Sequence, residues 1–283
     1  MQTILHPVEN VPLDVAVRLC REAIEQRPMR IAFAGRAGAG KTSVAGLLSQ
    51  NVWEVLNHAD MIKEEILEWL VDAMLQGFDP ESDQAFEHFA NFMGISPARI
   101  QDDLWDLIGP VYAEFSKLYL VAKREKWPLA EFAMKGPGVD IKEKVAFVDS
   151  HKGVFRRAMQ LYSEMSKELT ADEHYWVNMT ISRSLATHVC FNADTRWKSE
   201  VDMLRNCAWK IIYLDINDET QKKRRPEMTD EERNHSSEWS ITGKDCDLSI
   251  DSNQSLSAVI MQIAEYLLSF PPSKKVRAYG FVA

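Results

Sequence analysis

Residues 29–43 read MRIAFAGRAGAGKTS, and they carry the strongest structural signal in the chain. The first six residues, 29–34, are almost all apolar and predict a short buried strand. A glycine-rich turn follows, and then a segment from about Lys41 to Gln50 that predicts a helix. A strand, a glycine loop and a helix in this order are typical of the opening of a parallel α/β fold.

Within this stretch, Gly35 to Thr42 match the spacing G-x-x-x-x-G-K-[ST] of the phosphate-binding P-loop. Glycine accepts positive φ and lets backbone N–H groups approach phosphate oxygens, and the helix that follows points its positive end at the anion. We expect Lys41 to bridge the β- and γ-phosphates of ATP and the Thr42 hydroxyl to hold Mg²⁺. The residues expected at the ATP phosphates are Gly35, Ala37, Gly38, Ala39, Gly40, Lys41, Thr42 and Ser43.

Composition narrows the class of protein. The chain has 283 residues, enough for one large domain or two small ones, and 46% of them are hydrophobic, which is typical of a folded protein. Its formal net charge of −9 does not indicate a long basic face for nucleic acid. The sequence lacks an apolar run of membrane-spanning length and a secretory signal, so we expect no membrane partner and a cytoplasmic location.

The order of the predicted strands, glycine loop and helices along the chain predicts a single domain of the P-loop NTPase type, with a parallel sheet flanked by helices. Its core covers about 29–76 and 154–270, a helical insertion covers about 77–150, and a lid covers about 217–240. Breaks between helices are predicted near Gly77–Pro80, Gly94–Pro97 and Gly109–Pro110, with a turn at 136–138 (GPG). The further strands are predicted at 52–58, 187–192, 209–214 and 247–250, and further helices at 13–27, 60–76, 154–169, 173–187 and 255–268.

Asp194 and Arg196 come directly after the predicted strand 187–192. A carboxylate at the carboxyl end of a core parallel strand faces the crevice in which phosphates lie. Asp194 would hold Mg²⁺ through water or accept a proton from an attacking hydroxyl, and Arg196 would clamp a phosphate. The alternative is a helix cap by the aspartate and a surface ion pair of Arg196 with Glu200.

Segment 217–240 is charged and poor in apolar residues, which indicates a mobile loop or a short helical lid. Such a lid would close over the triphosphate and bring arginines to the charge of the transition state. The alternative is a solvated loop, because its own acidic residues nearly cancel its cations. The cations are Lys222, Lys223, Arg224, Arg225 and Arg233.

The order of these motifs resembles that of the phage deoxynucleoside monophosphate kinases, a branch of the P-loop nucleotide kinases. The shared order carries the resemblance, which covers roughly 29–76 and 154–266. One departure is that the family's G-T-E reads Tyr162-Ser163-Glu164 here. Outside the P-loop the matching stretches are 59–63 (ADMIK), Arg156 or Arg157 with Gln160, 176–178 (WVN), 194–200 (DTRWKSE), 235–238 (HSSE) and 247–253 (DLSIDSN).

The resemblance implies a helical region that binds the phosphate acceptor, and a lid. It implies that the acceptor lies among Asp60, Lys63, Arg157, Gln160 and Arg196. It makes Arg224, Arg225 and Arg233 the candidate lid arginines. The candidate catalytic residues are Lys41, Asp60, Asp194, Arg196 and Arg225, with Thr42 and Asp194 at the metal.

We therefore expect an ATP- and Mg²⁺-dependent phosphotransferase that acts on a deoxynucleotide. A monophosphate acceptor needs no base, whereas a hydroxyl acceptor needs one, for which Asp60 and Asp194 are the candidates. One alternative is a kinase of the same fold that phosphorylates the hydroxymethyl group of a modified pyrimidine, 5-hydroxymethyluracil, in phage DNA. Another is an ATP-dependent switch or accessory protein without kinase activity. The chain could also form a homodimer. If it is encoded by a phage, it would work in the host cytoplasm.

Overall fold

The computed structural model describes residues 11–50, 52–77, 79–80, 82–96, 102–134 and 141–270, so the turn predicted at 136–138 lies outside the described residues. Two compact units make up the chain. The sheet unit consists of Met1–His58 and Met179–Ala283, and the helical unit of Ala59–Asn178. The helical unit therefore extends on both sides of the block predicted at 77–150.

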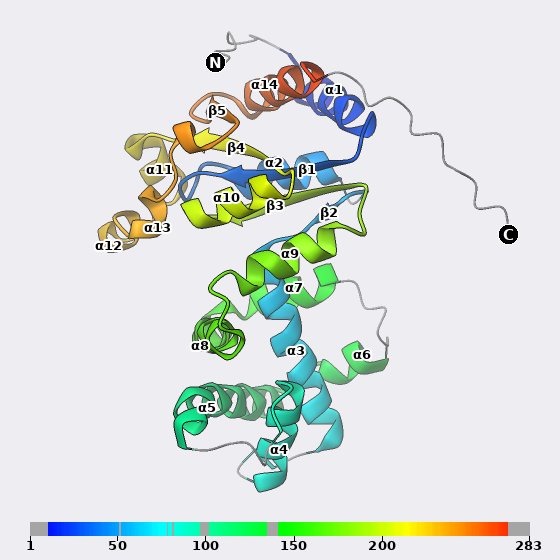
Figure 1. Cartoon of the computed structure of the whole chain (residues 1–283), viewed down its shortest axis with the longest axis vertical. Helices are drawn as coiled ribbons and strands as arrows, with labels where there is room; N and C mark the ends of the chain where they lie inside the picture. The colour runs from blue at the N-terminus through cyan, green and yellow to red at the C-terminus, as the bar shows by residue number, and fades with distance from the viewer. Residues whose placement is uncertain are drawn as a thin grey trace, which may run out of the picture. The chain divides into compact units, whose positions relative to one another are not determined.

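The sheet unit is built on five parallel strands in the order β2-β3-β1-β4-β5 (Figure 1). This confirms the predicted α/β class with a parallel sheet. β3 continues to Thr195 instead of ending at 192, because Thr195 still pairs with Ala34. Asp194 thus belongs to the strand. The strands are β1 (Met29–Ala34), β2 (Glu54–Val55), β3 (Val189–Thr195), β4 (Lys210–Asp215) and β5 (Leu248–Asp251).

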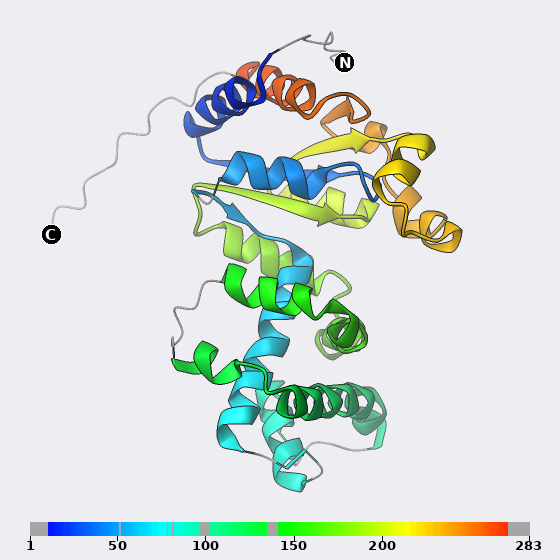
Figure 2. The same cartoon turned by 180° about the vertical axis from the view of Figure 1, so that it is seen from behind.

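Helices cover both faces of this sheet. Alternate strand residues such as Ile31, Phe33 and Phe191 share one buried apolar cluster with α1 (Leu13–Glu25), α2 (Lys41–Ser49) and α14 (Leu256–Leu268). Figures 1 and 2 show α1 and α14 side by side on this face. On the other face lie α10 (Lys198–Asn206) and the end of α9 (Tyr175–Ser184). Burial on both faces explains why the strands are apolar almost throughout.

The helical unit packs around an aromatic core. The ring of Trp69 lies 5.0 Å from that of Phe115 and 5.8 Å from that of Phe89, measured between centroids. Such edge-on pairs add to the stabilisation that apolar burial gives. The helices are α3 (His58–Gln76), α4 (Asp83–Phe92), α5 (Asp102–Glu125), α6 (Leu129–Met134), α7 (Ile141–Ser150) and α8 (Lys152–Thr170).

α5 runs through Gly109–Pro110, where a break was predicted. Proline removes one backbone hydrogen bond from a helix, but the face of α5 that carries Ile108, Val111 and Phe115 is fully buried. The glycine also fits its place, because a Cβ on Gly109 would lie 3.2 Å from the ring of Trp105. Burial of one continuous apolar face therefore outweighs the local signal to end the helix.

Segment 217–240 folds into short helices, while its role as a lid stays a prediction. They are α11 (Asp218–Arg224), α12 (Asp230–Arg233) and α13 (Ser236–Trp239). Side chains cap the first two: the Asn217 side chain accepts the N–H of Thr220, and Thr229 accepts that of Glu232. Capping satisfies the free N–H groups of helices that are too short to be stable alone.

The core of the sheet unit can be tested with one substitution at two positions. Leu48 is fully buried and Leu185 is 69% exposed. We expect Leu48→Ala to lower the free energy of unfolding by about 2–5 kcal/mol, because it leaves a cavity. Leu185→Ala should change it by no more than about 0.5 kcal/mol. Urea unfolding followed by circular dichroism measures both, and equal effects would contradict the assigned burial.

Candidate functional site

A glycine loop, residues 35–40, joins β1 to α2. Its three glycines adopt positive φ: 132° at Gly35, 81° at Gly38 and 94° at Gly40. Gly35 is also confined, because a Cβ there would clash with the backbone carbonyl of Leu214 in β4. At Gly38 a Cβ would approach the side chain of Arg225 to 3.1 Å. The loop therefore needs glycine for its conformation and for its close packing.

The loop lies at the point where the sheet topology reverses. β1 and β3 are neighbours, yet the chain leaves β1 toward the β2 edge and leaves β3 toward β4. In open α/β sheets ligands bind at the carboxyl ends of such a strand pair. The pairing of Ala34 with Thr195 brings the end of β3, with Asp194, beside the start of the loop.

Lys41, the first residue of α2, points back over the loop. Its Nζ donates hydrogen bonds to the carbonyl oxygens of Gly35 and Arg36, the latter at 3.2 Å. Burial lowers the pKa of Lys41 to about 8; the positive charges of Arg196 and Arg225 add to this, and Glu238 and Asp194 oppose it. The nearby carboxylates therefore compensate the positive charge of the Lys41 ammonium group only in part, and this favours the approach of an anion.

A buried polar network holds Asp194. Its Oδ1 accepts the backbone N–H of His58 at 3.1 Å, and the His58 Nδ1 lies 2.8 Å from the Thr180 hydroxyl. Asn192 Oδ1 accepts the backbone N–H groups of Asp194 and Thr195, each at 3.1 Å. The Asp194 side chain remains 20% exposed, so its carboxylate is fixed yet accessible to a ligand.

Neither His58 nor Asn192 was predicted from the sequence. His58 lies 136 residues from Asp194, and both His58 and Asn192 are buried polar residues in segments that the sequence predicts as ordinary strands. The structure instead begins α3 at His58. A single sequence carries no signal that pairs such residues.

Segment 217–240 is fastened to the glycine loop. Arg224 donates to the carbonyl oxygen of Gly38 at 3.2 Å, and the Gln221 side-chain amide donates to that of Ala37 at 3.1 Å. Arg36 holds the segment from the loop side, since its guanidinium donates to Asp218 and to Gln221, each at 2.6 Å. Gln221 and Arg36 are further residues that sequence reasoning did not single out.

The remaining arginines of the candidate site differ in their surroundings. Arg233 is buried inside segment 217–240 and donates to the carbonyl oxygens of Met228 and Arg225. Arg225 pairs with Glu227. Arg196 is 52% exposed, with its guanidinium 3.8 Å from the Glu238 carboxylate. The positive charges of Arg196 and Arg225 act on Lys41, whereas Arg233 holds the segment together through its hydrogen bonds to backbone carbonyls.

Four of the five expected acceptor residues belong to the helical unit. Lys63 is buried and donates to Asp60 at 2.9 Å and to Asp149 at 3.1 Å. Burial alone would lower the pKa of Lys63, but the charges of Asp60 and Asp149 and their hydrogen bonds raise it above its usual range. Arg157 and Gln160 lie exposed, one turn apart on α8. The fifth residue, Arg196, belongs to the sheet unit.

The fit of a Mg²⁺ ion depends on oxygen donors. Across the described ranges, no three His, Cys, Asp or Glu side chains gather in a way that could hold a metal ion. Thr42 lies exposed in the first turn of α2, and the Asp194 side chain is 20% exposed. Mg²⁺ is usually bound by one or two such groups together with water and substrate phosphates. The residues present fit that mode and no all-protein metal cage.

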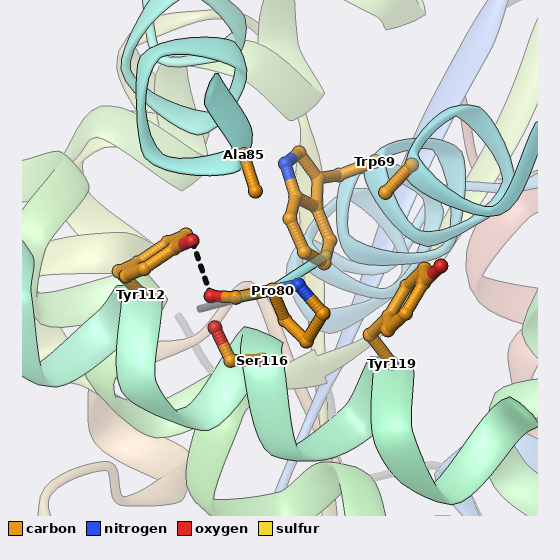
Figure 3. A pocket seen from close by; sticks show the side chains of 7 residues that line it. Trp69, Pro80, Ala85, Tyr112, Ser116 and Tyr119 are labelled. Atoms are coloured by element: carbon orange, nitrogen blue, oxygen red, sulfur yellow. Dashed lines mark hydrogen bonds between the residues drawn. The ribbon is translucent and has the colours of Figure 1, made fainter. Parts of the chain in front are cut away.

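A small pocket in the helical unit does not qualify as a nucleotide site. It lies between α3, α4 and α5, where Tyr112 donates to the carbonyl oxygen of Pro80 at 2.7 Å (Figure 3). Its volume of about 10 Å³ holds at most one water molecule. The pocket is lined by Trp69, Ala73, Pro80, Ala85, Tyr112, Ser116 and Tyr119.

Comparison with known proteins adds no family to this picture. The sequence matches no protein-family model, and no curated protein matches it significantly. In the part of the chain that the structure describes, no helix combines the length and the apolar character that crossing a bilayer requires.

The position of Lys41 leads to a testable titration. We expect its ammonium group to lose its proton with a midpoint near pH 8, compared with about 10.4 for an ordinary lysine. The charged form is therefore present below pH 8 and lost above it. Reductive ¹³C-methylation of the lysines and NMR measure this directly, and the Lys41→Arg variant identifies the resonance. A Lys41 signal that titrates with the exposed lysines would contradict the described surroundings.

Proposed function

We propose that this chain is an ATP- and Mg²⁺-dependent phosphotransferase whose acceptor is a deoxynucleotide. The observation that carries the proposal is the glycine loop at the carboxyl end of β1, with an incompletely compensated lysine at the start of α2. Backbone N–H groups at a helix N-terminus and a nearby ammonium group are suited to a polyphosphate. The order of motifs shared with the phage deoxynucleoside monophosphate kinases supports the choice of acceptor.

The sheet unit would bind the donor. Lys41 would leave its carbonyl partners and donate to the phosphate oxygens, where its charge is better compensated than in the free chain. Arg196 and Arg225 would add positive charge where negative charge develops during transfer. Segment 217–240 would exclude water, because it already covers the loop through Arg224 and Gln221.

Thr42 and Asp194 would hold Mg²⁺. The ion, when bound, neutralises charge on the phosphates. The His58 backbone N–H would keep the Asp194 carboxylate in place through its 3.1 Å hydrogen bond. Removing that carboxylate as Asp194→Asn should therefore reduce transfer far more than it reduces binding of ATP without metal.

The helical unit would bind the acceptor. Exposed Arg157 would contact its phosphate, and Gln160 on the same helix would read a base edge through its amide donor and acceptor. A monophosphate acceptor is already largely ionised and needs no base. A hydroxyl acceptor would need one, and Asp60 or Asp194 would serve.

The proposal is tested with γ-labelled ATP, Mg²⁺ and the purified chain. One series holds each deoxynucleoside monophosphate, including hydroxymethylated pyrimidines, and the other holds DNA with or without hydroxymethyl bases. We expect label in a nucleoside diphosphate and its loss in Lys41→Ala. Label retained on modified DNA would instead support the kinase of hydroxymethyl pyrimidines. Release of free phosphate alone would contradict both and favour an ATP-dependent switch.

The two neighbouring arginines of α8 allow a matched test of the acceptor side. We expect Arg157→Ala to raise the KM for the acceptor by about tenfold or more, because a charged hydrogen bond to phosphate is lost. The KM for ATP should stay unchanged, and Arg156→Ala should have little effect on either. Steady-state kinetics measure all four values. The reverse pattern would transfer the acceptor role to Arg156.

A further inference from the structure

Glu238 is the buried carboxylate that lies against the glycine loop and that the function proposed above does not use. Its side chain is 6% exposed. The Glu238 Oε2 accepts the backbone N–H of Ala37 at 2.6 Å, across a separation of 201 residues. The same oxygen lies 3.4 Å from the side-chain nitrogen of Gln221.

The other groups around this carboxylate are cations of the candidate phosphate site. Glu238 Oε1 lies 3.8 Å from the guanidinium of Arg196. Its negative charge also acts on Lys41, the lysine that we expect at the phosphates. Phosphate oxygens commonly accept hydrogen bonds from the backbone N–H groups of glycine loops and from lysine and arginine side chains. Glu238 therefore uses the donor types that an anionic ligand of this loop needs.

The position of Glu238 is fixed by its own element. α13 begins at Ser236, where the ring nitrogen of His235 accepts the N–H of Ser237. The next residue, Trp239, stacks on Arg36, with the guanidinium 4.1 Å from the ring centroid, and donates its indole N–H to the carbonyl oxygen of Arg233 at 3.1 Å. The carboxylate is thus held at the loop by packing on both sides and does not reach it as a flexible surface side chain.

We propose that Glu238 is a built-in competitor for the anion that the glycine loop binds. In the free chain its carboxylate occupies the Ala37 N–H and Arg196, and it holds α13 down on the loop. A polyphosphate must displace it. Displacement releases Arg196 for the ligand, so the energy of the Glu238 contacts sets how far they weaken the binding of the ligand. The inference rests on the proposed function only in taking the ligand to be a polyphosphate.

The test compares the full chain with Glu238→Ala, Glu238→Gln and a control, Glu231→Gln. Glu231 lies in the same segment, is exposed and undergoes the same change of charge as Glu238→Gln. Calorimetric titration with inorganic tripolyphosphate, and separately with ATP, measures affinity. Thermal unfolding verifies that each variant is folded.

We expect Glu238→Ala to bind tripolyphosphate about tenfold more tightly than the natural chain, the worth of one charge-assisted hydrogen bond. Glu238→Gln should lie between the two, because it keeps an acceptor for the Ala37 N–H but loses the charge. Glu231→Gln should leave the affinity unchanged. Equal or weaker binding by both Glu238 variants would overturn the inference.

The outcomes separate the inference from the proposed function. Tighter tripolyphosphate binding by the Glu238 variants, without label transfer to any acceptor, would support the inference and contradict the phosphotransferase. Label transfer to an acceptor, with equal tripolyphosphate affinities of the natural chain and the Glu238 variants, would support the phosphotransferase and contradict the inference. Absence of tripolyphosphate binding in every form of the chain would overturn both.

Discussion

The close approach of Gly35 to the carbonyl of Leu214 is the constraint on which the candidate site depends. β1 lies at the centre of the sheet, with β3 on one side and β4 on the other. The chain must turn out of β1 beside the backbone of β4, and a side chain at position 35 would block that turn. α2 then begins at Lys41, directly after the loop, and the N–H groups of its first turn have no partner within the helix.

The loop in turn organises the charges around it. Lys41, Arg196 and Arg225 bring three positive charges together, and Asp194 and Glu238 bring two negative ones. Like charges that lie close together repel one another, and the repulsion is strongest where a group is partly desolvated, as Lys41 is. The carboxylates reduce this repulsion in the free chain, while the lowered pKa of Lys41 indicates that they do not remove it. A site with a surplus of positive charge is suited to a ligand with several negative charges.

The part of the site that the sequence could predict is the part that local sequence encodes. β1, the glycine loop and the start of α2 are contiguous, and each follows from residue types at fixed spacing. The end of β3 was placed too early, because its last residues are held by pairing with Ala34, which no local pattern reveals. The break predicted at Gly109–Pro110 was wrong, because burial of a whole helix face outweighs one missing hydrogen bond and α5 continues through it.

Contacts between residues that are distant in the sequence could not be predicted from the sequence alone. The segment 235–238 drew attention only as part of a shared motif order, with no role for its glutamate. Its contact with Ala37 depends on how α13 packs against Arg36, and therefore on the stacking of Arg36 on Trp239. The roles expected of Asp60, Lys63, Arg157 and Gln160 stay predictions, because they belong to the helical unit and their function depends on a ligand.

Lys41 in the sheet unit and Lys63 in the helical unit differ in their partners, and this difference affects how strongly each would attract an anion. Lys63 is paired with Asp60 and Asp149, and its pKa is raised because the two carboxylates more than offset its burial. Lys41 has carboxylates nearby as well, but its direct hydrogen bonds go to backbone carbonyls and its pKa is lowered. An incoming anion therefore gains more from Lys41 than from Lys63, whose charge is already satisfied. In the helical unit the exposed Arg157 of α8 would therefore be the better partner for a phosphate, while Lys63 donates to Asp60 in α3 and to Asp149 in α7.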